Sequence, residues 1–428
     1  MRHVVSELVL DNGSRGLLIN IPDASVMTFD FNFRAGEYLV DENKIEVPHL
    51  MEHIILGAND FIPRARDFQA ELEKNGAYNN ASTGVYDITY EAECADFEWE
   101  RVMRLMLIAI SKPLFLEEEF RSEFGNVAEE MAARSNNHFR KLGLTMSKEF
   151  GLIARTDEEH LKLMKNVTNN DIKEHYYKTH GSKNMRFIIA GKINKTRQAK
   201  IKKILEEINL SNEGERFILP DEIIIKPSKP IYIKNQTVKN LYFYLDTFSK
   251  DRLIDREYDA LSIVNTFLTE TLYSKILGTA RELGLVYGMN SGISHTKNSS
   301  NWWFGAQVSF KNSLPLMDII TKEISNLKNG KISNSEIKAT KQYALGRFQR
   351  SAQTVGGTVA GYRNRYFFDE VIEPYDQIPT RIMKINKNDM VKTTNKMFTD
   401  KIWGIGVLGG CGYDFINELE NRLALLWL

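Results

Sequence analysis

The stretch "VPHLMEHIIL", residues 47–56, places two of the chain's eight histidines four positions apart. If the stretch is helical, His49 and His53 share one face, because side chains at i and i+4 lie one above the other. Glu52, three residues after His49, lies on the same side. Two neutral imidazoles, one further carboxylate and an open position make a catalytic zinc site. Zinc lowers the pKa of coordinated water to about 7, and a nearby carboxylate can accept its proton.

The pattern H-x-x-E-H is specific, because a chain of this composition contains it by chance on the order of 0.01 times. Pro48 also suits the first turn of a helix, where its missing N–H costs nothing. We therefore expect a helix that carries a metal site. The other six histidines stand alone or in polar company and are expected to be structural: His3, His138, His160, His175, His180 and His295.

The bulk composition limits the function classes. A chain of 428 residues exceeds what one hydrophobic core usually supports, which predicts two or more domains. Lys+Arg and Asp+Glu balance at 56 each, which argues against a general nucleic-acid or anionic-membrane binder. Cys94 and Cys411 lie too far apart in the sequence to suggest a disulfide framework or a cysteine metal cluster. No secretion signal or run of roughly 18 apolar residues is found, so a cytoplasmic location is expected.

The order of predicted elements occurs twice. Strands come first ("SELVLDNG", "GLLINIP", "SVMTFDFNF"), then the histidine helix, further helices and a buried strand, "NMRFIIAGKI". Periodicity fades from Asn209 to Pro230, which indicates a linker. The second half repeats the order but has no histidine pair in the helix that begins near Glu257. This predicts an α+β fold of two homologous α/β sandwich domains, 1–215 with the metal and 216–428 without, each a mixed sheet packed with helices.

On these residues the chain resembles the insulinase/pitrilysin family of zinc metallopeptidases, from "LDNG" to "VLGG". It looks most like the two-domain branch that includes the mitochondrial processing peptidases and their bacterial relatives. The resemblance implies a third zinc ligand, a glutamate, and a second glutamate two helical turns earlier that supports a ligand. "EFGNVAEEM" matches, with Glu123 in the supporting place and Glu130 on zinc. Glu129 competes by proximity, but the seven-residue step from Glu123 favours Glu130.

Two further segments resemble the family's substrate-binding parts. "NGAYNNASTGVYDITYEAE" matches the segment around an N-A-x-T core, whose edge strand takes the substrate as an added strand. Asn80 and Ala81 take the matching places, and Asn80 is expected to hold a substrate backbone group near the metal; a polar turn is the alternative. "ARELGLVYG" implies that Arg281 and Tyr287 grip the substrate and steady the oxyanion. The two residues stand six positions apart, where seven is commoner.

The resemblance implies a zinc endopeptidase or oligopeptidase, with one Zn2+ per chain, that cuts unfolded peptides inside a chamber of four such domains. Glu52 is expected to accept a proton from water and pass it to the leaving amine. One chain supplies two domains, so a homodimer is expected, or a heterodimer with a metal-free relative. No nucleic-acid or membrane partner is expected. The alternatives are a non-catalytic chaperone-like or structural subunit, which usually lacks the metal motif, and a protease dedicated to maturing one peptide.

Overall fold

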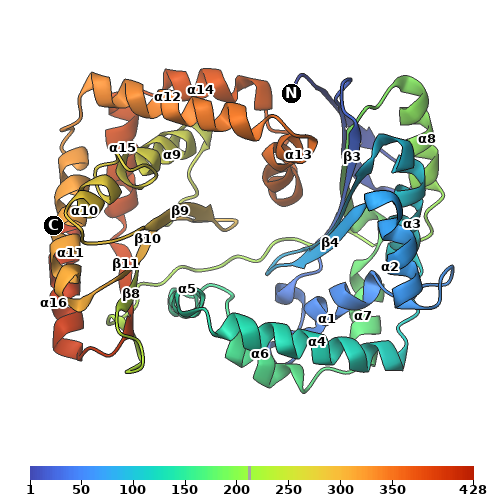
Figure 1. Cartoon of the computed structure of the whole chain (residues 1–428), viewed down its shortest axis with the longest axis horizontal. Helices are drawn as coiled ribbons and strands as arrows, with labels where there is room; N and C mark the ends of the chain where they lie inside the picture. Colours follow the sequence, from blue (N-terminus) through green and yellow to red (C-terminus); the bar gives the residue numbers. More distant parts are fainter. Residues whose placement is uncertain (211–213) are drawn as a thin grey trace. The chain divides into compact units, whose positions relative to one another are not determined.

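The computed structural model describes residues 1–210 and 214–428, which divide into two compact units (Figure 1). Unit 1 comprises Met1–Ala133, Glu158–Leu219 and Arg350–Tyr375, and unit 2 comprises Arg134–Asp157, Pro220–Gln349 and Asp376–Leu428. The change of unit after Leu219 lies close to the junction expected at 215/216, but each unit also takes a segment from the other half of the chain. Residues 211–213 of the expected linker lie outside the described residues, and its remaining residues form no helix or strand.

The sheet of unit 1 is mixed, with the strand order β1-β2-β6-β3-β5-β4. Strands β2 and β6 run parallel, and the other neighbouring pairs are antiparallel. Their bounds are β1 (Val4–Val9), β2 (Arg15–Asn20), β3 (Val26–Phe33), β4 (Tyr78–Thr83), β5 (Ile88–Ala95) and β6 (Met185–Gly191). Strand β4 is therefore an edge strand, which can accept an additional strand.

One face of this sheet packs against the helices that follow its strands. Alternate residues of β3 point to opposite faces, so Phe29, Phe31 and Phe33 enter the core with Leu50 and Ile54 of the histidine helix. The helices of unit 1 are α1 (Val47–Ile55), α2 (Ala65–Glu73), α3 (Trp99–Ser111), α4 (Glu117–Ser135), α6 (Asp157–Met164), α7 (Asn169–Thr179), α8 (Lys195–Glu206) and α13 (Val355–Asn364).

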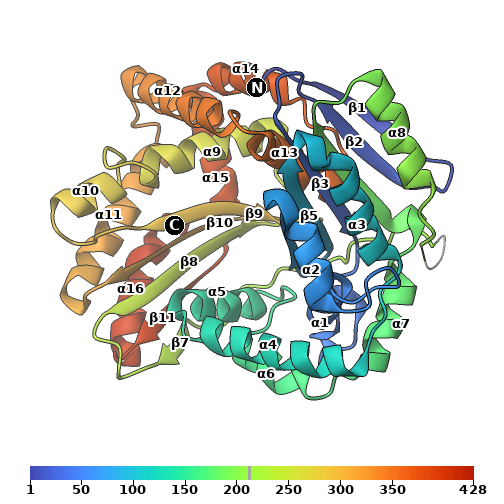
Figure 2. The same ribbon diagram turned by 45° about the vertical axis from the view of Figure 1, so that its right-hand side comes forward.

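The opposite face of the unit 1 sheet carries α13, a helix from the C-terminal half of the chain, which packs on β3 and β6 (Figure 2). An ion pair fixes it. Arg363 donates two hydrogen bonds to Asp30, at 2.8 and 2.9 Å, and one to Glu91 at 2.8 Å. Asp30 is only 2% exposed, and burial raises its pKa to about 6 although Arg363 acts in the other direction.

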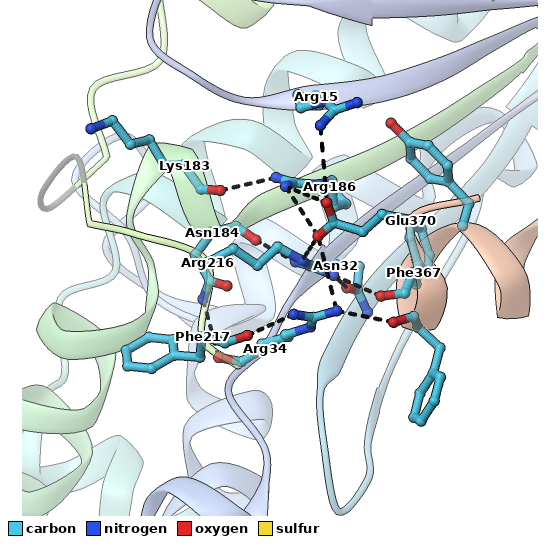
Figure 3. A network of polar contacts seen from close by, with 12 residues as sticks. Arg15, Asn32, Arg34, Lys183, Asn184, Arg186, Arg216, Phe217, Phe367 and Glu370 are labelled. Atoms are coloured by element: carbon cyan, nitrogen blue, oxygen red, sulfur yellow. Dashed lines mark hydrogen bonds and ion pairs between the residues drawn. The ribbon is translucent and has the colours of Figure 1, made fainter. Parts of the chain in front are cut away.

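A network around Glu370 anchors the segment that follows α13 (Figure 3). Its carboxylate accepts two hydrogen bonds from Arg186, both 3.1 Å, and lies 2.7 Å from Nε of Arg216. Arg34 donates to the carbonyl of Phe368 at 3.0 Å, and Arg216 donates to the carbonyl of Phe367 at 2.8 Å. Burial and neighbouring arginines lower the pKa of Arg216 to about 9, so its guanidinium keeps its charge at neutral pH. The network therefore ties the segment to Arg34 directly after β3, to Arg186 of β6 and to Arg216 of the expected linker.

The sheet of unit 2 repeats this topology, with the order β7-β11-β8-β10-β9 and one parallel pair, β7 with β11. Its strands are β7 (Ile231–Lys234), β8 (Leu241–Ser249), β9 (Asn290–His295), β10 (Ser300–Val308) and β11 (Ile402–Gly409). Its helices are α5 (His138–Glu149), α9 (Asp255–Thr269), α10 (Leu277–Glu282), α11 (Phe310–Lys328), α12 (Asn334–Ser351), α14 (Ile378–Lys384), α15 (Lys387–Thr399) and α16 (Tyr413–Ala424).

Helix α5, from the N-terminal half, covers the sheet of unit 2 by apolar contact (Figure 2). Leu142 and Met146 pack on the sheet in a cluster that also holds residues of β7, β8 and β11. Glycines allow this close approach. A Cβ on Gly406 would lie 2.5 Å from Met146 Sδ, and one on Gly305 would lie 2.3 Å from the Phe139 ring. The two exchanged helices are thus held by different chemistry, ionic for α13 and apolar for α5.

The repeated topology confirms the predicted fold class. Strands β2, β6, β3, β5 and β4 correspond in order and direction to β7, β11, β8, β10 and β9, and β1 has no counterpart among the described strands of unit 2. Helix α9 occupies the place of α1 in the order of elements and contains no histidine. Within the described ranges, no helix has both the length and the apolar character needed to cross a membrane.

Candidate metal centre

The predicted histidine helix is confirmed as α1, with Pro48 in its first turn. Its apolar side chains Leu50, Met51, Ile54 and Ile55 are fully buried and fix the rotation of the helix against the sheet. Positions 49, 52 and 53 consequently lie on the opposite, less buried side. The burial pattern of one helix therefore sets where both imidazoles and the carboxylate point.

His49, His53 and Glu130 form a cluster whose ligand atoms lie within 4.8 Å of one another. Oε2 of Glu130, on α4, is 3.4 Å from Nε2 of His49 and 3.6 Å from Nε2 of His53. In a tetrahedral zinc site with bonds of about 2.1 Å, ligand atoms are about 3.4 Å apart. The spacing and the donor set therefore fit zinc. Glu129 is exposed and lies outside the cluster.

Carboxylates behind the two histidines orient the imidazoles. Nδ1 of His53 is 3.0 Å from Oε2 of Glu123, and Nδ1 of His49 is 3.0 Å from Oε2 of Glu46. An imidazole that donates from Nδ1 presents the lone pair of Nε2, which is the atom turned toward Glu130 in both histidines. The hydrogen bond with His53 lowers the pKa of Glu123.

The electrostatics of the cluster favour a cation. Burial acts to lower the pKa of His49, but Glu130, Glu46 and Glu52 outweigh it and raise this pKa to about 10. The carboxylates thus stabilise a positive charge where the imidazoles converge, and a metal ion in that place supplies one. Burial likewise opposes the ionisation of Glu46, yet the hydrogen bonds with His160 and His49 lower its pKa to about 2.

Glu52 is oriented by the edge strand. Oγ1 of Thr83, the last residue of β4, donates to Oε2 of Glu52 at 2.9 Å. The carboxylate of Glu52 therefore stands on the side of α1 that carries the histidines and close to β4, the last strand of the described sheet. Sequence reasoning did not single out Thr83, although it occupies the threonine position of the N-A-x-T core.

The alternation of β4 separates its side chains into two groups. Asn79 donates to Gln69 of α2 at 3.2 Å and Ala81 packs against the core, on the side of Thr83. Asn80 is exposed on the other face, where its Nδ2 is 3.4 Å from Oε1 of Glu91. The structure therefore places Ala81, but not the side chain of Asn80, on the face of the cluster. The role of Asn80 toward a substrate stays a prediction.

Arg281 and Tyr287 are brought together in unit 2, whereas the cluster belongs to unit 1. Arg281, near the end of α10, donates to the carbonyl of Tyr287, and its guanidinium carbon lies 4.7 Å from the centre of the tyrosine ring. Tyr287 is 86% exposed, so its hydroxyl is accessible to a ligand. Their roles toward substrate stay predictions.

Glu46 and His160 were not identified from the sequence as parts of the site. Glu46 is 1% exposed, and its second oxygen, Oε1, forms a short hydrogen bond with Nδ1 of His160 on α6. The spacing of Glu46, three residues before His49, could have predicted their contact, since i and i+3 side chains meet on a helix. His160 gave no such signal because it lies 114 residues away from Glu46.

Comparison with known proteins finds two family models that match the chain and several solved structures of similar fold. Residues 19–161 match the family described as insulinase (peptidase family M16), and residues 166–343 match the domain described as the peptidase M16 inactive domain. The fold is similar to that of a protease from Helicobacter pylori, with a TM-score of 0.82, 17% identity, and coverage of 95% of this chain and 100% of that one.

Two other solved structures share the fold. A peptidase M16 inactive domain from Pseudomonas fluorescens has a TM-score of 0.81 and 15% identity, covering 95% of this chain and 98% of that one. A chain of complex III2 from Candida albicans has a TM-score of 0.80 and 13% identity, covering 97% of this chain and 100% of that one. These likenesses show the fold. With both family domains matched in order along one chain, the protein belongs to the insulinase family, peptidase family M16.

Proposed function

We propose that the chain is a zinc-dependent endopeptidase or oligopeptidase that hydrolyses peptide bonds of unfolded peptides. The observation that carries this proposal is the convergence of His49 Nε2, His53 Nε2 and the Glu130 carboxylate on one point, with Glu52 beside them. A zinc ion bound there would polarise the peptide carbonyl and lower the pKa of a coordinated water to about 7.

The chain's own residues supply the remaining functions. His49, His53 and Glu130 bind the ion, and Glu52 accepts a proton from water and returns it to the leaving amine. Thr83 holds the Glu52 carboxylate through its 2.9 Å hydrogen bond. The free edge of β4 binds an extended peptide by backbone hydrogen bonds, a mode that selects unfolded segments.

The proposal is tested by the variant Glu52→Gln. The amide keeps the shape of the side chain and the hydrogen bond from Thr83, but it cannot accept a proton at neutral pH. We expect one zinc per chain in both proteins and a turnover at least about 100-fold lower in the variant. Peptide cleavage is followed on a mixed peptide library while zinc is added in steps to the metal-free protein.

The outcome separates this function from the alternatives. Activity in wild type that rises to a plateau at one zinc per chain supports it, and equal activity in Glu52→Gln contradicts it. A wild-type protein that binds zinc and cuts no peptide would favour the non-catalytic subunit. Cleavage of one peptide in the library and of no other would favour a dedicated maturation protease. The residues of the metal cluster are all present, which argues against the non-catalytic role.

We further propose that the chain acts as a homodimer in the cytoplasm, with a heterodimer as the second possibility. The Candida albicans neighbour belongs to a multisubunit complex, so related chains do assemble. The chain comprises two units of like fold, and two-fold association is the commonest route from such a chain to a four-domain chamber. Light scattering of the purified protein tests this: about twice 49.3 kDa is expected, and a fully active monomer contradicts it.

A further inference from the structure

Glu46 stands at an unusual place for a buried carboxylate, directly before the first residue of α1. An aspartate at that position commonly caps the helix by accepting from a backbone N–H, but the side chain of Glu46 makes no such bond. Both oxygens instead contact imidazoles: Oε2 lies 3.0 Å from Nδ1 of His49, and Oε1 is hydrogen-bonded to Nδ1 of His160. The carboxylate is therefore shared between a candidate metal ligand and a histidine outside the cluster.

Burial makes this arrangement stiff. The side chain of Glu46 is 2% exposed and that of His160 is 11% exposed, so water cannot readily replace either partner. A buried carboxylate is costly unless its lone pairs are satisfied, and here each oxygen has one imidazole N–H. Rotation of the carboxylate to follow a moving His49 would break the bond with His160. Helix α6, which carries His160, consequently fixes the ring of His49.

The two candidate ligand histidines are supported unequally. The partner of His53 is Glu123, which is 24% exposed and also accepts from Asn126 on its own helix. Glu123 belongs to α4, the helix that also carries Glu130, so these two residues move together. His49 is supported from a different helix, through a more deeply buried carboxylate with two partners.

We propose that Glu46 is a positioning residue for His49 and that His160 positions Glu46, so that contact between α6 and the start of α1 sets the affinity for zinc. This inference rests on the proposed function, because it takes His49 as a metal ligand. It assigns a role to two residues that the H-x-x-E-H pattern does not contain.

Two variants test the arrangement through zinc affinity, measured by competition with a chromophoric chelator. Glu46→Gln offers one acceptor oxygen where two are needed and turns its NH2 toward the other imidazole N–H. We expect zinc affinity to fall by about 10- to 100-fold, the usual cost of losing a residue behind a metal ligand. His160→Phe keeps a planar aromatic ring but removes the N–H, so a smaller loss, about 3- to 10-fold, is expected.

The zinc affinity of the double variant distinguishes this arrangement from a general loss of packing. If His160 acts only through Glu46, adding His160→Phe to Glu46→Gln should change zinc affinity by less than about twofold. Independent effects would instead multiply. The visible spectrum of the cobalt(II)-loaded protein gives a second reading, because a displaced His49 alters the ligand geometry and hence the absorption bands in both single variants.

Matched controls come from the same unit. His175→Phe removes another buried imidazole, which contacts the carbonyl of Ala35 at 2.8 Å and lies outside the cluster. Glu119→Gln alters another buried carboxylate, which accepts from the backbone N–H of Ala58 at 2.9 Å. Both controls should leave zinc affinity and the cobalt spectrum unchanged, and circular dichroism reports whether each variant is folded.

Three results would overturn the inference and leave the proposed function standing. Folded Glu46→Gln that binds zinc within twofold of wild type would show that Glu46 does not position His49. Multiplicative losses in the double variant would show that His160 does not act through Glu46. If Glu46→Gln fails to fold, an unchanged zinc affinity in folded His160→Phe would show that contact between α6 and the start of α1 does not set the affinity for zinc. Wild type that binds no zinc would overturn the proposed function as well, so the two failures are distinguishable.

Discussion

The ion pair that holds α13 on the sheet of unit 1 gives the sharpest stability prediction. Arg363 forms two parallel hydrogen bonds with Asp30, whose carboxylate is only 2% exposed. Arg363→Met keeps most of the side-chain volume but leaves this carboxylate buried without its cation. Breaking a buried pair by removing one partner costs about 3–5 kcal/mol, so we expect a loss of that size at pH 7.

The pH dependence follows from the raised pKa of Asp30. Burial raises this pKa from the ordinary aspartate value of 3.8 to about 6, so the folded state binds the proton more tightly than the unfolded state. The contribution of Asp30 to stability is therefore fully present below about pH 4 and is lost as the pH rises through about 6. Without Arg363 the pKa of Asp30 rises further. The penalty of Arg363→Met should consequently be smaller at pH 5 than at pH 7.

Urea unfolding at pH 7 and pH 5 measures the loss of stability in Arg363→Met. Hydrogen exchange of β3 and α13 shows whether this loss is confined to unit 1. In Arg363→Met with Asp30→Asn, the buried carboxylate of Asp30 is gone and only the partly exposed Glu91 loses its cation, so most of the stability should return. The matched control is Arg381→Met, because Arg381 makes the same two-bond contact with Asp259, whose side chain is 14% exposed. The variant Arg381→Met should lose about 1 kcal/mol of stability. A loss below that value for Arg363→Met, or a penalty that grows on acidification, would refute the reasoning.

The remaining predictions concern the site and unit 2. Glu130→Gln should weaken zinc binding about tenfold or more, whereas the exposed Glu129→Gln should leave it unchanged; the reverse would exclude Glu130 as the ligand. Tyr287→Phe should lower kcat by about 10- to 1000-fold at unchanged zinc content if the hydroxyl steadies the oxyanion, and unaltered kinetics would exclude that role. Burial acts to raise the pKa of Glu336, but Lys275 and the backbone of Ser333 lower it to about 2. The stability contribution of Glu336 is thus present above about pH 4.5 and lost as the pH falls toward 2. Because Glu336 is partly exposed, Glu336→Gln should cost about 1–2 kcal/mol in urea unfolding at pH 7 and less at pH 4; a cost independent of pH would contradict this.

The parts of the site that were predictable are those encoded by spacing along one element. The i, i+4 spacing of His49 and His53 placed both rings on one helix face, and the seven-residue step from Glu123 favoured Glu130, which the structure brings to the histidines. The same kind of counting indicates on which face of β4 the side chain of Asn80 lies. Asn80 lies three residues before Thr83, so strand alternation turns its side chain away from Glu52.

The parts that were not predictable depend on contacts between distant segments. An amphipathic pattern shows which face of a helix is apolar, but not which sheet it will cover, so the exchange of α5 and α13 between the halves of the chain was missed. The contact of Glu46 with His160 likewise joins residues 114 positions apart. No local pattern marks such a pair, because its partner is chosen by the packing of α6 and not by spacing along α1.

The central claim is that His49, His53 and Glu130 hold a zinc ion in position for Glu52. Diffraction data collected on either side of the zinc absorption edge, from crystals of zinc-loaded protein, test it most directly. The account predicts one anomalous peak per chain, about 2.0–2.2 Å from Nε2 of both histidines and from a carboxylate oxygen of Glu130. A peak bound by other residues, or a zinc-loaded protein with no peak between these three side chains, would contradict it.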